Sequence, residues 1–157
     1  MKTVFCSLIL CSCTFGFVYD FRALDFFDKP VDFQNLKMYT IVIFASTDDC
    51  KLTSELSALN NIYQTHKDKL VTFVGFAIYS AKNQDKKFCS INYGVDFSML
   101  DKFNNGIGKL QIYTKQLYKT TTPPLYQPLI VHQGKIIVIQ NAQELNATLS
   151  TLAHKEL

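Results

Sequence analysis

The sequence predicts a single α/β domain whose core is a central mixed β-sheet flanked by helices. Two continuous apolar runs, at 39–45 and 70–79, are long enough for buried strands, and a helical pattern follows the first. Two shorter apolar runs near the C-terminus enclose a glycine turn, which indicates an antiparallel hairpin. The 157 residues are 48% hydrophobic, which suffices for one sizeable core and is too little for two domains.

The N-terminal half predicts a hairpin, a strand, a helix and a second strand, in that order. The segment 19–36 carries the turn signal Asp28-Lys29-Pro30 between two extended pieces, so a small N-terminal β-hairpin is expected. The run 39–45 is rich in β-branched and aromatic residues, which is typical of a strand buried on both faces. From about Thr53 to His66, apolar residues recur at helical spacing. The run 70–79 predicts the second buried strand.

The C-terminal half predicts a helix over 82–92 ended by Gly94, a loop over 101–108 and a helix over 109–118. Strands are expected at 129–132 and 136–139 around the turn Gln133-Gly134-Lys135, followed by a last helix over 143–153. This order of elements is that of a thioredoxin-like fold, with parallel strands joined by a right-handed crossover. Functional residues of such open sheets usually lie at the carboxyl ends of the parallel strands.

The first residues read as a signal peptide. A basic start and a short apolar run precede small residues suited to cleavage after Gly16, and the run is shorter than the about 20 residues of a membrane span. We therefore expect a signal peptide over 1–16, a domain over 17–157 and an exported, secreted protein. A lipid anchor at Cys13 and an uncleaved anchor are the alternatives. The sequon at Asn146 matters only in a eukaryotic host.

Charge and cysteine content narrow the classes of function. The net charge is +3 and the lysines are scattered, which argues against nucleic-acid binding. No two histidines have metal-ligand spacing, so no metal or other cofactor is expected. Of five cysteines, Cys50 and Cys89 remain after the leader, in a compartment that permits disulfides. The absence of a long oligomerisation insert favours a monomer.

Two motifs carry a resemblance to a known family. The run 88–102, FCSINYGVDFSMLDK, resembles the FCxxxYGVxFxMxDK segment of glutathione peroxidases. The spacing of Cys50, Thr53, Leu59, Asn60 and Tyr63 is similar to the CxxTx5LNxxY pattern of the family's active-site helix. The resemblance covers nearly all of the chain after the leader, which is identified as a divergent member of this family.

The resemblance implies a thiol-dependent peroxidase that reduces hydroperoxides in defence against oxidative stress. Cys50 would be the peroxidatic residue, which must react as a thiolate. Cys89 matches a resolving position, where it could form a disulfide with the sulfenic acid of Cys50. A thiol co-substrate, glutathione or more readily a thioredoxin-like protein, would then reduce that disulfide. The alternative for Cys89 is a core cysteine on an apolar helix face.

The sequence departs from the family where the reaction takes place. Family members read AS-x-C-G after the first core strand, whereas this chain reads ASTDDCK over 45–51. Counted from the strand, Asp48 occupies the peroxidatic position; counted from the helix, Cys50 does, and the helix carries more identities. Lys51 and a helix start favour a thiolate there, whereas the two aspartates disfavour it.

The hydrogen-bond donors of the family's site, a glutamine, a tryptophan and an asparagine, are also replaced. Ser80 stands at the glutamine position with Gln84 as the nearest substitute, and Pro124-Leu125 stands at the tryptophan–asparagine pair. Thr47, Ser80 and Gln84 are the candidate replacement donors. Pro128 resembles the cis-proline of thioredoxins, or is an ordinary trans-proline at the start of a strand.

These losses leave more than one function open. The first is a peroxidase of weak or altered activity. The second is a catalytically inactive thioredoxin-fold binding or structural protein that descends from the family. A redox or copper chaperone on the same fold is disfavoured, because such proteins carry C-x3-C before the helix and Cys50 stands alone.

Overall fold

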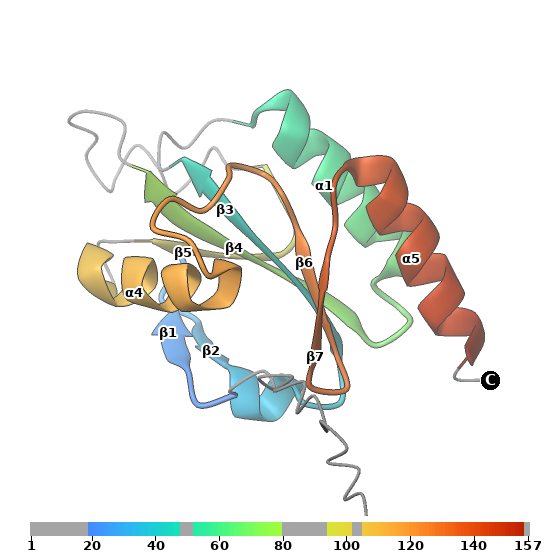
Figure 1. Ribbon diagram of the computed structural model, residues 1–157, viewed down its shortest axis with the longest axis horizontal. Helices are drawn as coiled ribbons and strands as arrows, with labels where there is room; N and C mark the ends of the chain where they lie inside the picture. Colours follow the sequence, from blue (N-terminus) through green and yellow to red (C-terminus); the bar gives the residue numbers. More distant parts are fainter. Residues whose placement is uncertain (1–18, 48–51, 80–93, 102–104, 156–157) are drawn as a thin grey trace, which may run out of the picture.

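The computed structural model describes residues 19–47, 52–79, 94–101 and 105–155, and it confirms the predicted α/β class (Figure 1). Eleven elements lie within these ranges: β1 (Arg22–Leu24), β2 (Pro30–Asp32), the 3-10 helix η1 (Phe33–Leu36), β3 (Thr40–Thr47), α1 (Ser54–His66), β4 (Val71–Tyr79), β5 (Ser98–Asp101), α4 (Ile107–Tyr118), β6 (Leu129–His132), β7 (Lys135–Val138) and α5 (Ala142–Lys155). The predicted leader over 1–16 and the predicted helix over 82–92 lie outside the described residues.

The central sheet has the strand order β5-β4-β3-β6-β7. Strands β3, β4 and β5 are parallel, whereas β6 and β7 are antiparallel additions on the other side of β3. A separate two-stranded sheet, β1-β2, is the predicted N-terminal hairpin. This is the mixed sheet of a thioredoxin-like fold, and it brings the carboxyl ends of β3 and β4 to the same edge.

Alternating side chains of β3 supply both halves of the core. Val42 and Phe44 face the cluster beneath α1 and α5, while Ile41, Ile43 and Ala45 face the cluster beneath α4 and the hairpin. All five are fully buried, as expected for a central strand covered on both faces. Figure 1 shows α1 and α5 side by side on one face of the sheet and α4 on the opposite face.

Individual residues determine where the helix α1 begins and how β6 and β7 are joined. Thr53, the expected helix start, is the N-cap of α1, where its side chain accepts a hydrogen bond from the Leu56 N–H at 3.1 Å. Gln133 and Gly134 have φ values of 49° and 75°, the two left-handed residues of a type I′ turn, which joins β6 to β7 as predicted. The described residues contain no cis peptide bond, so Pro128 is the ordinary trans-proline.

Two expectations need correction. The predicted loop over 101–108 is shorter than expected, because Asp101 ends β5 and α4 begins at Ile107. Strand β5 itself was not predicted: its four residues, SMLD, are too few and too mixed to show a period, and the strand forms because β4 offers a parallel partner. Within the described ranges, no helix is long and apolar enough to cross a bilayer.

Candidate functional site

The candidate site lies at the carboxyl end of β3, where the sequence places the start of the reactive loop. Thr47 is the last residue of β3 and is half-buried. The pairing of β3 with β4 shifts between Ser46, opposite Ala77, and Thr47, opposite Tyr79. Such an irregularity bends the strand and changes the direction of the following side chain, and it is common beside active sites.

Among the predicted site residues, only Thr47 is described. Cys50, Cys89, Ser80 and Gln84 lie outside the described residues, as does Asp48. In the sequence, Cys50 is three residues after Thr47 and three before Thr53. Because α1 begins at Ser54, Cys50 precedes that helix.

A tyrosine that the sequence did not single out contacts Thr47. The Tyr126 hydroxyl and Thr47 Oγ1 are 3.2 Å apart and share a hydrogen bond in which either oxygen can donate. The Tyr126 N–H also donates to the Ala45 carbonyl at 2.8 Å, which holds the segment along β3. Tyr126 has φ 55°, in the left-handed region that bulky residues rarely adopt. Strained residues of this kind are concentrated at functional sites.

Two further tyrosines hold the backbone on either side of Tyr126. The Tyr118 hydroxyl lies 2.6 Å from the Gln127 carbonyl and 3.3 Å from the Ile43 carbonyl. The Tyr79 hydroxyl donates to the Pro123 carbonyl. Burial raises the pKa of both phenols above 10.0, so each stays protonated and can donate at neutral pH. The segment that carries Tyr126 is therefore fixed at both ends.

Pro124 and Leu125, which the sequence resemblance sets against the family's tryptophan and asparagine, supply no side-chain donor. Pro124 has no N–H group, and Leu125 is an apolar side chain that is 45% exposed. Leu125 nevertheless pairs with Ala45 in a parallel bridge, so the segment does run beside the end of β3. Among the described residues, the Tyr126 hydroxyl, next to Leu125 in the chain, is one polar group at this edge.

A second anchor fixes the start of the segment 94–97 on α1. The Asp96 N–H donates to Asn60 Oδ1 at 2.9 Å, and Gln64 Nε2 donates to Asp96 Oδ2. Gly94 has φ 62°, and a Cβ added to it would be 3.4 Å from the Leu52 side chain. Asn60 is part of the sequence pattern that resembles the active-site helix of glutathione peroxidases. Its side chain here joins α1 to the segment that precedes β5.

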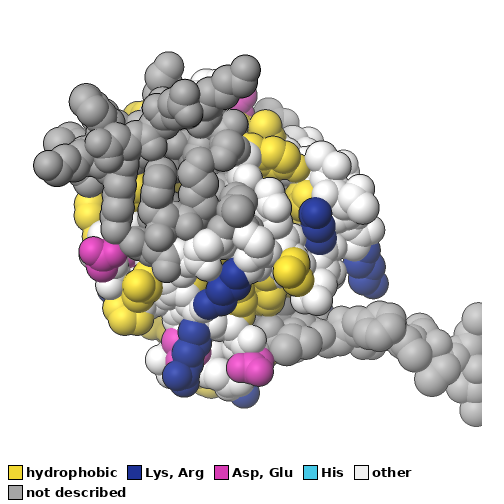
Figure 2. Space-filling model, turned by 90° about the vertical axis from the view of Figure 1, so that its left-hand side faces the viewer, with side chains coloured by type: hydrophobic (Ala, Val, Ile, Leu, Met, Phe, Trp, Pro, Cys, Tyr) yellow, Lys and Arg dark blue, Asp and Glu magenta, His cyan; other side chains and the backbone are white. Residues whose placement is uncertain are grey.

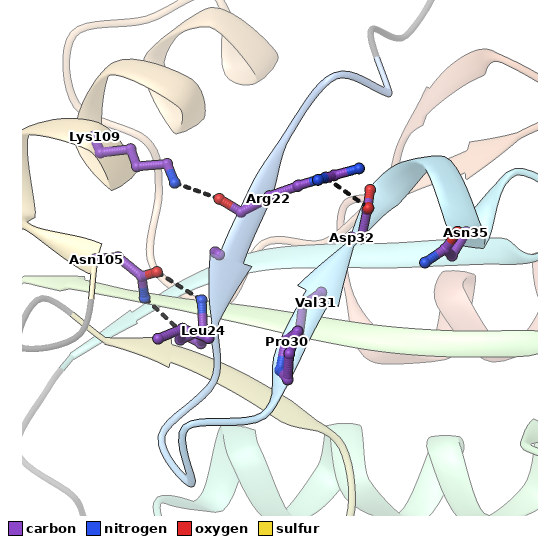
Figure 3. Close-up of a pocket in the computed structure, with 9 residues that line it drawn as sticks. Arg22, Leu24, Pro30, Val31, Asp32, Asn35, Asn105 and Lys109 are labelled. Carbon is purple, nitrogen blue, oxygen red and sulfur yellow. Dashed lines mark hydrogen bonds and ion pairs between the residues drawn. The ribbon is translucent and has the colours of Figure 1, made fainter.

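The pocket in Figure 3 lies elsewhere, between the β1-β2 hairpin and the start of α4, with a volume of about 430 Å³. Four of its polar side chains hold these elements together. Arg22 pairs with Asp32 at 2.7 Å, Asn105 makes two 2.7 Å hydrogen bonds to the Leu24 backbone, and Lys109 donates to the Arg22 carbonyl. These contacts indicate that the residues lining the pocket dock the hairpin rather than perform a reaction.

The described residues include no group suited to a metal ion, and the face seen in Figure 2 carries charges of both signs. No three His, Cys, Asp or Glu residues in the described ranges are grouped to hold a metal ion. Figure 2 shows the face that carries α4 and the hairpin, where side chains of both charge signs lie close to one another between hydrophobic ones. This pattern fits the small net charge of +3.

Comparison with known proteins identifies the family. Residues 18–117 match the family model described as glutathione peroxidase, which is well over half of the 157 residues. A glutathione peroxidase of Lactococcus lactis subsp. cremoris is 30% identical over 91 residues, covering 54% of this chain and 58% of that protein. The glutathione peroxidase-like peroxiredoxin gpx1 of Schizosaccharomyces pombe is 31% identical over 93 residues, covering 55% and 59%.

The matched regions thus span less than two thirds of these curated relatives. The crystal structure of T. cruzi GPX1 shares the fold with a TM-score of 0.61 and 16% identity, covering 87% of this chain and 95% of that one. The sequence motifs, the mixed sheet and the family model agree, and the chain therefore belongs to the glutathione peroxidase family, as a divergent member with a thioredoxin-like fold.

Proposed function

We propose that this protein is a thiol-dependent peroxidase that reduces hydroperoxides, with Cys50 as the peroxidatic residue. The observation that carries the proposal is the place of Cys50 in the sequence, three residues past the end of β3 and three before the N-cap of α1. The chain leaves β3 at the carboxyl edge of the parallel strands, where this type of sheet usually holds its site. Relatives named glutathione peroxidase and glutathione peroxidase-like peroxiredoxin support the same reaction.

The reaction proceeds in three steps. The Cys50 thiolate attacks one peroxide oxygen, so an S–O bond forms, the O–O bond breaks and the sulfur loses two electrons. The second oxygen leaves as an alcohol once it takes up a proton. Cys89 then attacks the sulfenic acid, releasing water and forming a disulfide, which glutathione or a thioredoxin-like dithiol reduces. Thr47, Ser80 and Gln84 are the candidate donors to the peroxide, and no cofactor takes part.

A coupled turnover assay tests this proposal. The mature protein is supplied with hydrogen peroxide and with either glutathione plus glutathione reductase or a thioredoxin system, and NADPH consumption is followed. We expect turnover that disappears in Cys50→Ser, and thioredoxin-dependent turnover that falls strongly in Cys89→Ser. Turnover that survives in Cys50→Ser would refute the assignment of the peroxidatic residue. Unchanged thioredoxin-dependent turnover in Cys89→Ser would refute the resolving role alone.

The second candidate is a catalytically inactive protein that keeps the fold as a binding or structural module. The specific observation in its favour is the pair Pro124-Leu125, which offers no side-chain donor at the edge of β3. An inactive protein would show no turnover with any thiol reductant, and its Cys50→Ser variant would behave like the wild type in the same assay.

We also propose export as a monomer, with a signal peptide over 1–16 removed and the domain 17–157 retained. The basic start and the short apolar run support this proposal. N-terminal sequencing of protein secreted from an expression host, with light scattering for its mass, tests both parts. A mature chain that begins after Gly16 and has a monomeric mass is expected; an intact N-terminus, or a lipid on Cys13, would contradict it.

A further inference from the structure

We infer that the pocket over the β1-β2 hairpin, drawn in Figure 3, binds a small organic monocarboxylate that has an apolar chain. This inference does not depend on the peroxidase function proposed above. The volume of about 430 Å³ is within the range of sites that hold small molecules. The described residues that line the pocket come from the hairpin, from η1 and from the start of α4.

The floor of the pocket is the outer face of the hairpin, and this face has a polar half and an apolar half. Ala23 is buried in the core, and because side chains alternate along a strand, Arg22 and Leu24 lie on the outer face. Their partners across the ladder are Asp32 and Pro30. A ligand with one polar end and one apolar end fits this division.

The charges that line the pocket favour a ligand with a single negative charge. Arg22 and Lys109 are cations, and Asp32 is a carboxylate, so these three residues have a net charge of +1. A monoanion neutralises this charge. A dianion such as phosphate would leave an excess negative charge close to Asp32, which is unfavourable.

The polar half also offers donors that suit a carboxylate. Asp32 Oδ2 is 2.7 Å from Arg22 Nε, at the side of the guanidinium, so the end edge with the two Nη groups points away from this carboxylate. That edge can bind both oxygens of a second carboxylate, and the Arg22 side chain is 79% exposed. The side-chain amide of Asn35 makes no hydrogen bond to another described residue, and it lines the same pocket.

Both cations are held in place by contacts within the protein. Figure 3 shows the Arg22 side chain extending from β1 to Asp32 on β2, and Lys109 donating to the Arg22 carbonyl. An ammonium group has three protons, so Lys109 keeps two for a ligand. Because these contacts restrict the two side chains, a ligand would lose less binding free energy in ordering them.

Titration of the ¹⁵N-labelled protein with sodium hexanoate, followed through the amide chemical shifts, tests this inference. At pH 7 the carboxylate is ionised, and sodium chloride keeps the ionic strength constant because salt screens exposed charges. The comparison ligands are 1-hexanol, which has the same chain without the charge, and sodium phosphate, which has charge without the chain.

We expect hexanoate to shift the amide signals of residues 22–24, 31–35 and 105–109 in a saturable way, with millimolar affinity. Hexanol and phosphate should bind at least about tenfold more weakly, since each lacks one of the two matching parts. Arg22→Lys keeps the charge but loses the planar fork, and it should weaken hexanoate binding about tenfold.

Two further variants separate binding from folding and from bulk charge. Asn35→Asp places a second carboxylate in the pocket and removes no hydrogen bond between described side chains, so it should weaken hexanoate binding at least about tenfold. Lys109→Gln should weaken binding as well. Lys115→Gln makes the same change of charge at an exposed position of α4 outside the pocket, and it should bind hexanoate like the wild type.

Three outcomes would overturn the inference. The first is the absence of saturable shifts at these residues in the wild type. The second is an equal effect of Lys109→Gln and Lys115→Gln, which would indicate attraction by the net charge alone. The third is phosphate or hexanol binding as tightly as hexanoate. The spectrum of each free variant shows whether the hairpin remains folded, and Asn35→Asp decides the test if a cation variant unfolds it.

Discussion

At the residue scale, Tyr118 illustrates how one buried hydroxyl organises the candidate site. It reaches the carbonyls of Ile43 in β3 and Gln127 in the loop, and so joins two segments that the chain separates widely. Burial raises the pKa of this phenol above 10.0, and the nearby Tyr79 adds to the effect. The hydroxyl therefore remains a donor throughout the neutral range.

The first prediction concerns stability at alkaline pH. The unfolded chain releases the Tyr118 proton near pH 10, whereas the folded chain holds it, so this contribution is full below about pH 10 and is lost as pH rises through the folded pKa. Tyr118→Phe should lower the free energy of unfolding by about 1–3 kcal/mol near neutral pH, because two carbonyls lose their partner. Above about pH 10 the difference from the wild type should narrow. Urea unfolding of both proteins from neutral to alkaline pH measures this difference in the free energy of unfolding. A difference that does not change with pH would contradict this account of Tyr118.

A second residue-scale prediction concerns the contact between α1 and α5. His66 is only 1% exposed, and its Nε2 donates to Asn146 Oδ1 at 2.8 Å. Asn146→Ala should destabilise the fold by about 1–3 kcal/mol, because the buried imidazole N–H would lose its acceptor. Gln143→Ala, at an exposed position of the same helix, is the matched control and should be nearly neutral. Equal melting temperatures for the two variants would show that the contact contributes nothing.

At the element scale, the close approach of β4 to its neighbours restricts one position to glycine. A Cβ added to Gly75 would lie 2.3 Å from Met99 Sδ and 2.8 Å from Phe44 Cζ. Gly75→Ala should therefore cost about 1–3 kcal/mol through overpacking. Gly108, in the first turn of α4, has open space around it, and Gly108→Ala should instead stabilise by about 0.4–1 kcal/mol. Chemical denaturation of both variants checks that the two changes in the free energy of unfolding have opposite signs. If Gly75→Ala stabilised the protein, the close packing around Gly75 would be refuted.

The elements that could be predicted are those with a long local signal. Strands β3 and β4 are continuous apolar runs, and α1, α4 and α5 repeat their apolar residues at helical spacing, so their existence and order followed from the sequence. Strand β5 has four residues and depends on pairing with β4. No local pattern could show that dependence.

The candidate site was harder to predict than the fold for the same reason. The sequence singled out Thr47 because it precedes Cys50 in the chain, and its role as a donor stays a prediction. The contact between Thr47 and Tyr126 was not predicted, because it joins residues 79 positions apart and depends on the left-handed backbone of Tyr126. The available signal was the place of Tyr126 directly after Pro124-Leu125.

At the scale of the whole molecule, the topology keeps the position of the candidate site independent of the residues that form it. The sheet order β5-β4-β3-β6-β7 fixes the ends of β3 and β4 beside each other, independently of the side chains that end there. Loops at such an edge can exchange residues while the scaffold stays the same.

The central claim is that Cys50 reacts directly with hydroperoxides, and trapping of its sulfenic acid tests this most directly. The reduced protein is mixed with hydrogen peroxide and a dimedone-type probe, and the labelled peptide is located by mass spectrometry, with Cys50→Ser as control. We predict rapid labelling of Cys50 in Cys89→Ser, and in the wild type a Cys50–Cys89 disulfide that replaces the label. Absence of Cys50-dependent labelling in either protein, without such a disulfide, would contradict the account.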